Sequence, residues 1–303
     1  MIKEVLAKQR KNPKVLVENK ISFAGPETEL SIYDTFEQAN RVQLKSDQLL
    51  FCGMVSGKKV MHDDTASYES EFLPHESFVM APNHQVEIDF PDARIDQPTT
   101  CLAIEISLER INNIVDRIEQ SAPLASEYGQ WQYHQHLVHT HHNAQTQALL
   151  NRIVQIYTEN HQDRNYMIDL AISELTVRLL RHQTRDFIIS HSEQLPDCNG
   201  LNAALHFINQ NLATNIDIEQ LCKIACMSRT KFFLQFKTHL GCTPAAYQQQ
   251  ERLKKAASMI KQGYQITQVC FDLGFTNASH FSRCFKQFFS LSPSAFKSRH
   301  LSS

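Results

Sequence analysis

The sequence predicts an α+β protein in two parts, a β-rich N-terminal domain followed by an all-α C-terminal domain. Between residues 21 and 106, short apolar or alternating runs are separated by Gly, Pro and Asn, a pattern typical of short strands joined by turns. Between residues 221 and 296, one helical pattern occurs twice. An internal repeat of this kind indicates that one structural unit is used twice. The charge of the chain also changes near residue 200.

This change of charge indicates what the C-terminal part binds. From residue 200 onward the chain has twelve Lys or Arg and four Asp or Glu, about +8, so residues 1–199 carry about −10 of the total of −2. A basic end on an acidic partner domain is typical of nucleic-acid binding. With 303 residues the chain can form two cores. We predict an N-terminal domain over 1–190, a polar linker over 191–200 and a DNA-binding domain over 201–300.

The start of the chain and its cysteines exclude several protein classes. Residues 1–20 carry mixed charge and lack the apolar core of a signal peptide. No apolar run approaches the roughly twenty residues of a membrane span, so we expect a cytoplasmic protein without a membrane partner. The eight cysteines are scattered without a C-x-x-C pair, which indicates neither a disulfide framework nor a zinc finger.

The first domain is predicted to be a small sandwich or barrel, because its strands are short and evenly spaced. Residues 72–83 resemble the strand and turn of a cupin-type β-barrel, so a cupin-like barrel is the expected architecture. The predicted strands are 29–33, 49–52, 59–61, 77–80, 86–90 and 101–106.

A cupin can be a metal enzyme, and this alternative depends on histidines. Cupin enzymes place two His and a Glu close together on one strand, with another His later. Here the nearest candidates are His62, His75, Glu76 and His84, and the region contains no His-x-His. We therefore predict no metal and no cofactor. The pocket of this domain is expected to bind a small molecule, or to have lost ligand binding so that the domain only mediates contacts.

A histidine-rich segment follows a predicted helix over 107–120. It contains His134, His136, His139, His141 and His142, and such a tract is able to bind zinc, copper or nickel. No Cys or carboxylate accompanies these residues, and the alternation around them also fits an exposed strand or loop. The favoured interpretation is a solvated polar segment.

Two longer helices are predicted next, over 145–160 and 165–185. Their apolar residues keep one face, and the short connection between them fits an antiparallel pair. A further helix over 201–212 begins the C-terminal domain.

The repeated pattern consists of two helix-turn-helix segments, module one over 218–240 and module two over 266–289. Turns are expected at 226–227 and 274–275, and Ser228 and either Thr276 or Asn277 suit the N-cap of the next helix. Apolar residues recur at i, i+3, i+4 and i+7 in each first helix: Ile218, Leu221, Cys222 and Ala225, then Ile266, Val269, Cys270 and Leu273. The second helices are predicted to bury Phe232, Phe236, Phe281, Phe285 and Phe288.

The second helix of such a segment can enter the DNA major groove. The face opposite the phenylalanines carries residue types suited to guanine, to other bases and to phosphate. The expected DNA-binding residues are Asn277, Ser279, Ser282, Arg283 and Lys286 in module two, and Arg229, Thr230, Lys231, Phe233, Leu234 and Lys237 in module one.

The two modules differ at the positions that would read bases. Phe233 and Leu234 are the repeat equivalents of Ser282 and Arg283, and an apolar side chain contacts a thymine methyl but donates no hydrogen bond. Either module one reads a T-rich segment through apolar contact, which we favour, or its helix is rotated and both residues pack internally.

Between the modules, residues 244–262 are predicted to form a bridging helix that ends at Gly263. About 18 helical residues span about 27 Å. With the flanking turns, this length suits two recognition helices about one DNA turn, roughly 34 Å, apart.

The chain resembles the AraC/XylS-type transcription regulators over about residues 201–298. The resemblance rests on the doubled module, the Gly274-Phe275 turn, the run Phe-Ser-Arg-Cys-Phe-Lys at 281–286 and the run Ser-Pro-Ser-Ala-Phe at 292–296. It implies a seven-helix double helix-turn-helix unit, a cupin-like sensor domain and a homodimer formed through the helices at 145–185. The alternative for these helices is that they only cover the barrel; we favour dimerisation. The partners it implies are promoter DNA, RNA polymerase and a small-molecule effector.

We therefore predict a sequence-specific DNA-binding transcription regulator, an activator rather than a repressor, that responds to an effector at its N-terminal domain. Two alternatives remain, a regulator controlled by a protein partner and a cupin-type metalloenzyme fused to a DNA-binding unit. No Gly-rich phosphate loop, Gly-x-Ser-x-Gly or His-Glu-x-x-His motif occurs, so no enzymatic activity is predicted.

Overall fold

The computed structural model describes residues 13–63, 68–124, 128, 131, 137–141, 144–194, 199–289 and 291–301. The chain forms two compact units. Unit 1 comprises Met1–Ile118 and Gln132–Val177, and unit 2 comprises Glu119–Trp131 and Arg178–Ser303. Each unit is therefore assembled from segments that are separated in the sequence.

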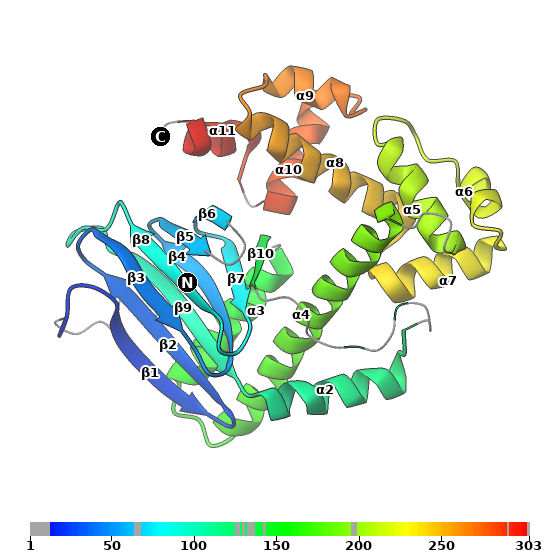
Figure 1. The fold of residues 1–303 in the computed structure, drawn as a ribbon. Helices are drawn as coiled ribbons and strands as arrows, with labels where there is room; N and C mark the ends of the chain where they lie inside the picture. Colours follow the sequence, from blue (N-terminus) through cyan, green and yellow to red (C-terminus); the bar gives the residue numbers. More distant parts are fainter. Residues whose placement is uncertain are drawn as a thin grey trace. The chain divides into compact units, whose positions relative to one another are not determined.

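Unit 1 contains two antiparallel sheets that lie face to face (Figure 1). The larger sheet has the strand order β1-β2-β9-β4-β7-β10, and the smaller has the order β3-β8-β5-β6. The strands are β1 Asn19–Gly25, β2 Thr28–Thr35, β3 Ala39–Lys45, β4 Leu49–Ser56, β5 Lys59–Asp63, β6 Tyr68–Phe72, β7 Glu76–Met80, β8 Gln85–Phe90, β9 Thr99–Ile106 and β10 Leu137–His141.

The core of unit 1 lies between these sheets. Successive side chains of a strand point to opposite faces, and β8 accordingly buries Val86, Ile88 and Phe90 while its other residues face outward. These three pack with residues such as Phe78 and Met80 of β7 from the opposite sheet. Neither sheet closes on itself over the described residues, so the predicted cupin-like barrel is not established by the strand pairing.

All six predicted strands are present, but β1, β3 and β6 were missed. β3 explains why: its sequence Ala-Asn-Arg-Val-Gln-Leu-Lys is mostly polar, and four of its seven residues are exposed. A strand whose outer face is in water buries few residues, and its apolar signal is correspondingly weak.

Three helices accompany the sheets, α2 Leu108–Ser121, α3 Ala144–Thr158 and α4 Arg164–Gln194. On α3, the Tyr157 hydroxyl hydrogen-bonds to Thr28 of β2. On α2, buried Arg110 donates to Asp169 Oδ1 of α4 over 2.6 Å. The helix predicted over 165–185 is longer than expected: α4 ends at Gln194. Residues 191–194, which were predicted to belong to the linker, are therefore helical.

Unit 2 is helical. Its helices after α4 are α5 Gly200–Gln210, α6 Ile218–Ile224, α7 Arg229–Leu240, α8 Pro244–Lys261, α9 Ile266–Asp272, α10 Ala278–Phe289 and α11 Pro293–Leu301. Across the described part of the chain, no helix has both the length and the apolar character needed to span a membrane.

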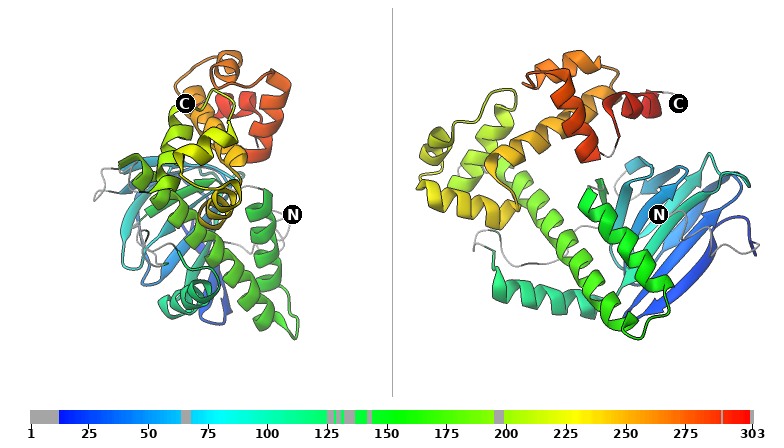
Figure 2. Two further views of the ribbon diagram at one scale, coloured as in Figure 1. Left: turned by 90° about the vertical axis from the view of Figure 1, so that its right-hand side faces the viewer. Right: turned by 180° about the vertical axis from the view of Figure 1, so that it is seen from behind.

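The helices of unit 2 surround two cores that share α8 (Figure 2). The first core contains Phe232 and Phe236 of α7 and Tyr247 of α8. The second contains Leu253 of α8 with Phe281 and Phe285 of α10. Phe289 lies in this core, whereas the predicted Phe288 only packs against its edge, because residues at i, i+4 and i+8 from Phe281 continue one helical face.

The two modules turn in the same way. Cys226 has φ +50° and Gly274 has φ +75°, and in each module the next amide donates back over five residues, Met227 to Cys222 and Phe275 to Cys270. This is the Schellman ending of a helix, in which the left-handed residue favours glycine. Both turns lie where the repeat predicted them.

Candidate nucleic-acid interface

The helix α10 has a buried face and an open face. Phe281 and Phe285 are fully buried on the inner side, and Cys284 is nearly so. Ser279, Arg283 and Lys286 are exposed and Ser282 is half-buried. The predicted DNA-facing residues of module two therefore lie together on one side of the helix, at the i, i+3, i+4, i+7 spacing.

The helix α7 has the same inner face, formed by buried Phe232 and Phe236. On the opposite side Thr230 and Lys237 are exposed, and the Leu234 side chain is 64% exposed. Phe233 differs from them: it is half-buried, with its ring centroid 6.2 Å from that of Phe232.

The exposure of these residues bears on the two alternatives for module one. The helix is not rotated, since its phenylalanines at 232 and 236 face the core. Leu234 points away from the core of unit 2, while Phe233 packs at the core's edge beneath the Arg229 guanidinium, which lies 5.9 Å from its ring centroid. Leu234 is therefore available for contact, and Phe233 supports the first turn.

Both helices begin at side-chain caps. Ser228 accepts a hydrogen bond from the Lys231 amide over 3.4 Å, and Asn277 accepts one from the His280 amide over 2.7 Å. Asn277, not Thr276, is thus the cap of α10. Its carboxamide oxygen serves the helix, which leaves chiefly its NH₂ group for a contact with DNA.

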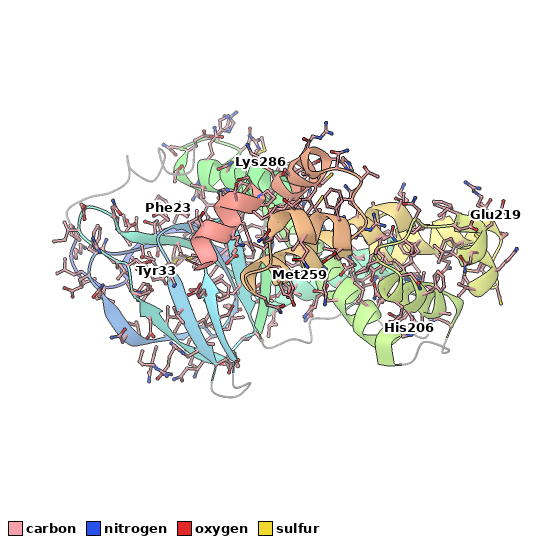
Figure 3. All side chains as sticks on the ribbon, turned by 90° about the horizontal axis from the view of Figure 1, so that it is seen from above. Phe23, Tyr33, His206, Glu219, Met259 and Lys286 are labelled. Carbon is pink, nitrogen blue, oxygen red and sulfur yellow. The ribbon has the colours of Figure 1, made fainter. Side chains whose placement is uncertain are left out.

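Charge on the two helices has one sign. Neither α7 nor α10 contains Asp or Glu. Arg229, Lys231, Lys237, Arg283 and Lys286 are all exposed. Figure 3 labels Lys286 of α10 and also Glu219, which belongs to α6 and not to α7 or α10. A surface of exposed cations without carboxylates suits a polyanion such as the phosphate backbone of DNA.

The histidines considered for a metal site in unit 1 have other partners. His62 Nε2 lies 2.8 Å from Asp89 Oδ2, and His84 Nε2 lies 2.9 Å from Asp63 Oδ2. His75 Nδ1 lies 3.2 Å from Gln147 Oε1. The Glu76 carboxylate accepts a hydrogen bond from the Leu73 amide. Within the described residues, no three His, Cys, Asp or Glu side chains form a group that could hold a metal ion.

The histidine-rich segment is only partly described. His134, His136 and His142 lie outside the described residues. His139 and His141 belong to β10, which pairs with β7, but the positions of their side chains are not described.

The sequence analysis assigned no role to Gln248 and Arg252, two polar residues of α8. Only the apolar face of the bridging helix was interpreted, whereas these two polar residues of α8 contact the backbone between α5 and α6. Their i, i+4 spacing was the available signal, because it places both on one face of α8.

Two family profiles match the chain and together cover most of it. A profile described as "Helix-turn-helix domain" matches residues 221–299. A profile described as "AraC-type transcriptional regulator N-terminus" matches residues 26–187, which is more than half of the chain.

Individual relatives agree with these profiles. An uncharacterized HTH-type transcriptional regulator of Haemophilus influenzae is 30% identical over 155 residues, which are 49% of this chain and 52% of the relative. The transcriptional activator RhaS of an Enterobacter species is 27% identical over 48% of this chain and 54% of its own. The chain thus spans about half the length of these relatives. ToxT from Vibrio cholerae aligns with 91% of this chain and 98% of its own at 16% identity and a TM-score of 0.36.

Proposed function

Because the chain belongs to the AraC-type transcriptional regulators, we propose that it is a sequence-specific DNA-binding regulator that reads promoter DNA with α7 and α10. One observation carries the proposal: α7 and α10 each bury phenylalanines on one face and leave the opposite face open, with exposed cations and no carboxylate on the helix. Because it would act on promoter DNA, we place the cytoplasm in the same proposal as its location.

In module two, Arg283 is the residue proposed to specify a base. Its guanidinium can donate two hydrogen bonds to guanine O6 and N7 in the major groove. Ser279 and Ser282 would contact bases or phosphate, and Lys286 and the Asn277 NH₂ group would hold the backbone. The i, i+3, i+4, i+7 spacing of the face supports this assignment.

In module one, Leu234 is proposed to contact a thymine methyl, because it is exposed and apolar. Thr230, Arg229, Lys231 and Lys237 would contact the phosphate backbone, where cations at the start and along one side of a helix position it in the groove. Phe233 would support α7 by packing against Phe232, and its contact with DNA would be limited to the deoxyribose of the backbone. The two half-segments would then differ, one reading guanine and the other a T-rich stretch.

The domain limits and finer architecture belong to the same proposal. Residues 201–300 would form the seven-helix double helix-turn-helix unit, residues 1–190 a cupin-like sensor and dimerisation domain, and 191–200 the connection between them. The α8 helix has 18 residues and spans about 27 Å. With its flanking turns it would set α7 and α10 about one DNA turn, roughly 34 Å, apart.

We further propose activation of transcription through contact with RNA polymerase, and control by a small-molecule effector at the N-terminal domain. The profile over 26–187 supports a sensor, and the name of one relative, a transcriptional activator, supports activation. A homodimer would raise the effective concentration of each module on paired sites.

The test is selection of bound duplexes by the full chain from a random-sequence 40-base-pair library. A single enriched site of two unlike segments is expected. Affinity for it should fall linearly with salt on logarithmic scales, because phosphate contacts release counterions. A full chain that stays folded yet enriches no sequence would contradict the proposal.

A further inference from the structure

The turn between α5 and α6 is bound by two side chains of α8. Gln248 Nε2 donates to the carbonyl oxygens of Asn211 and Thr214 over 3.2 and 2.7 Å. The Arg252 guanidinium donates to the Leu212 carbonyl and, over 2.7 Å, to that of Thr214. Three backbone carbonyls of one turn are thus held by residues four apart on one helix.

The same turn meets the turn of module two. Gly274 has φ +75°, and a Cβ there would lie 2.0 Å from the Ala213 carbonyl oxygen. The Arg252 guanidinium also lies 5.9 Å from the Phe275 ring centroid. Residues 211–214, which continue α5 of the first core, therefore contact module two directly.

These contacts lie where α8 passes from one core to the other. Tyr247, next to Gln248, is fully buried in the first core, and Leu253, next to Arg252, is buried in the second. Burial lowers the pKa of Arg252. The Arg252 side chain is half-buried, and its hydrogen bond to the Leu212 carbonyl is partly shielded from water, which strengthens it.

We propose that Gln248 and Arg252 form a clasp that fixes the separation and rotation of the two modules, and so determine the spacing between the two DNA segments that the protein reads. This proposal rests on DNA binding by both modules. Neither residue belongs to the recognition helices; both act as positioning residues. Each core packs one half of α8, so bending and twisting of α8 between the two cores is the motion that remains between the modules, and the clasp restricts it.

DNA geometry makes such a device consequential. One additional base pair moves a segment by about 3.4 Å and turns it by roughly a tenth of a full helical turn. Two modules held rigidly will reject a site whose segments are displaced in this way. Two modules with rotational freedom will tolerate it, at the cost of weaker binding to the preferred site.

The experiment compares full-length wild type, Arg252→Gln, Gln248→Ala and the control Lys255→Gln. Lys255 is exposed on the same helix, so its variant removes one charge without touching the clasp. The probe is the duplex selected by wild type, together with duplexes that have one or two base pairs inserted or deleted between its segments. The measured quantity is the ratio of affinities for the original and the altered spacing.

For wild type and Lys255→Gln, the ratio is expected to be at least about tenfold, since a displaced segment presents several wrong base pairs. For Arg252→Gln the ratio should fall below about threefold, and for Gln248→Ala it should fall to a value between this and the wild-type ratio. Both should bind the original duplex more weakly, while the bases preferred within each segment stay the same. A variant that was only less stable would bind the original and the altered duplexes more weakly by the same factor, so its ratio of affinities would stay unchanged.

Two results would overturn the clasp. One is a clasp variant that melts as a folded protein and keeps the wild-type ratio; because Gln248→Ala retains both Arg252 contacts, it serves as the milder variant where Arg252→Gln does not fold. The other is a wild type that selects a two-segment site and tolerates every spacing. A wild type that selects no site contradicts the proposed function itself.

Discussion

Arg283 and Leu234 occupy equivalent positions in α10 and α7, and both are exposed. An exposed Leu in the middle of a recognition helix contributes little to folding, since its apolar surface stays in water. Its presence is explained if it is covered when DNA binds. The two positions therefore separate a residue that specifies a base by hydrogen bonding from one that does so by apolar contact.

We predict that Arg283→Ala weakens binding to the selected site by about 1–3 kcal/mol and relaxes preference at one base pair, because it removes a bidentate donor. Leu234→Ala should lose preference at a T position and leave the melting temperature nearly unchanged. Site selection with each variant, beside thermal unfolding, measures both effects.

The matched control is Phe232→Ala, which truncates a fully buried side chain two residues from Leu234. It should cost about 3–5 kcal/mol of stability. If Leu234→Ala lowers the melting temperature as Phe232→Ala does and selects the wild-type site, apolar readout by Leu234 is wrong.

Glycines at two turns offer a second comparison at the scale of residues. Gly241 and Gly274 both have positive φ, but a Cβ at Gly241 meets nothing within 4 Å, whereas one at Gly274 meets the Ala213 carbonyl at 2.0 Å. We predict that Gly241→Ala costs roughly 1–2 kcal/mol, the price of the left-handed conformation. Gly274→Ala should cost about 1–3 kcal/mol more through overpacking.

Urea unfolding of the two variants measures this difference. Equal losses of stability would mean that the turn at 211–214 moves aside without cost, and would weaken the case that it holds module two in place.

At the scale of elements, α4 carries two kinds of apolar residue. Leu175 is 1% exposed and belongs to the core, so an acidic residue there would unfold the protein rather than separate a dimer. Tyr166 and Leu170 are 66% and 50% exposed and lie four residues apart on the same face. If α4 forms the proposed dimer interface, this exposed pair is the place to disrupt it.

We predict that the full chain is a dimer at tens of micromolar and that the double variant Tyr166→Glu, Leu170→Glu is a folded monomer, because acidic groups on a shared apolar face repel and cannot be desolvated cheaply. Sedimentation velocity gives the oligomeric state. Ile95→Glu makes a similar change at a 77% exposed residue of the loop after β8, and should remain dimeric. A monomeric wild type, or a dimeric double variant, contradicts the assignment of the interface.

At the scale of the whole molecule, the helical unit includes more than its two modules. Ile188 of α4 and Tyr128 are buried in the core of module one, and the Tyr128 hydroxyl donates to Asn202 Oδ1 over 2.8 Å. Arg185 of α4 lies 5.5 Å from the Tyr247 ring centroid. A fragment beginning near residue 200 would therefore expose part of that core.

We predict that the fragment 178–303 is more stable than 200–303 by roughly 2 kcal/mol, about the contribution of one buried Ile side chain. Both should bind the selected duplex with salt-dependent affinity. Urea unfolding compares the fragments, and Ile188→Ala within 178–303 should remove most of the difference. Equal stability of the two fragments would show that α4 merely covers the first module.

The sequence by itself determined the parts of this protein that depend on near neighbours. Spacings of three to five residues predict the inward phenylalanines at 232, 236, 281 and 285, the turns at Cys226 and Gly274 and the cap Ser228, and the structure has them there. For α10 the pattern left Thr276 and Asn277 open, and the structure has Asn277 as the cap. Helical periodicity and capping are local, so a single chain displays them. The open faces proposed to bind DNA were predictable for the same reason.

Only the tertiary structure decided which distant segments share a core. Nothing in the local pattern places Tyr128 and Ile188 with module one, buries Leu175 while leaving Leu170 exposed, or directs Gln248 and Arg252 to the carbonyls at 211–214. These choices rest on contacts between residues tens of positions apart, which produce no period in the sequence. The periodicity of an amphipathic helix indicates that it has an apolar face, whereas tertiary packing decides which segment covers that face.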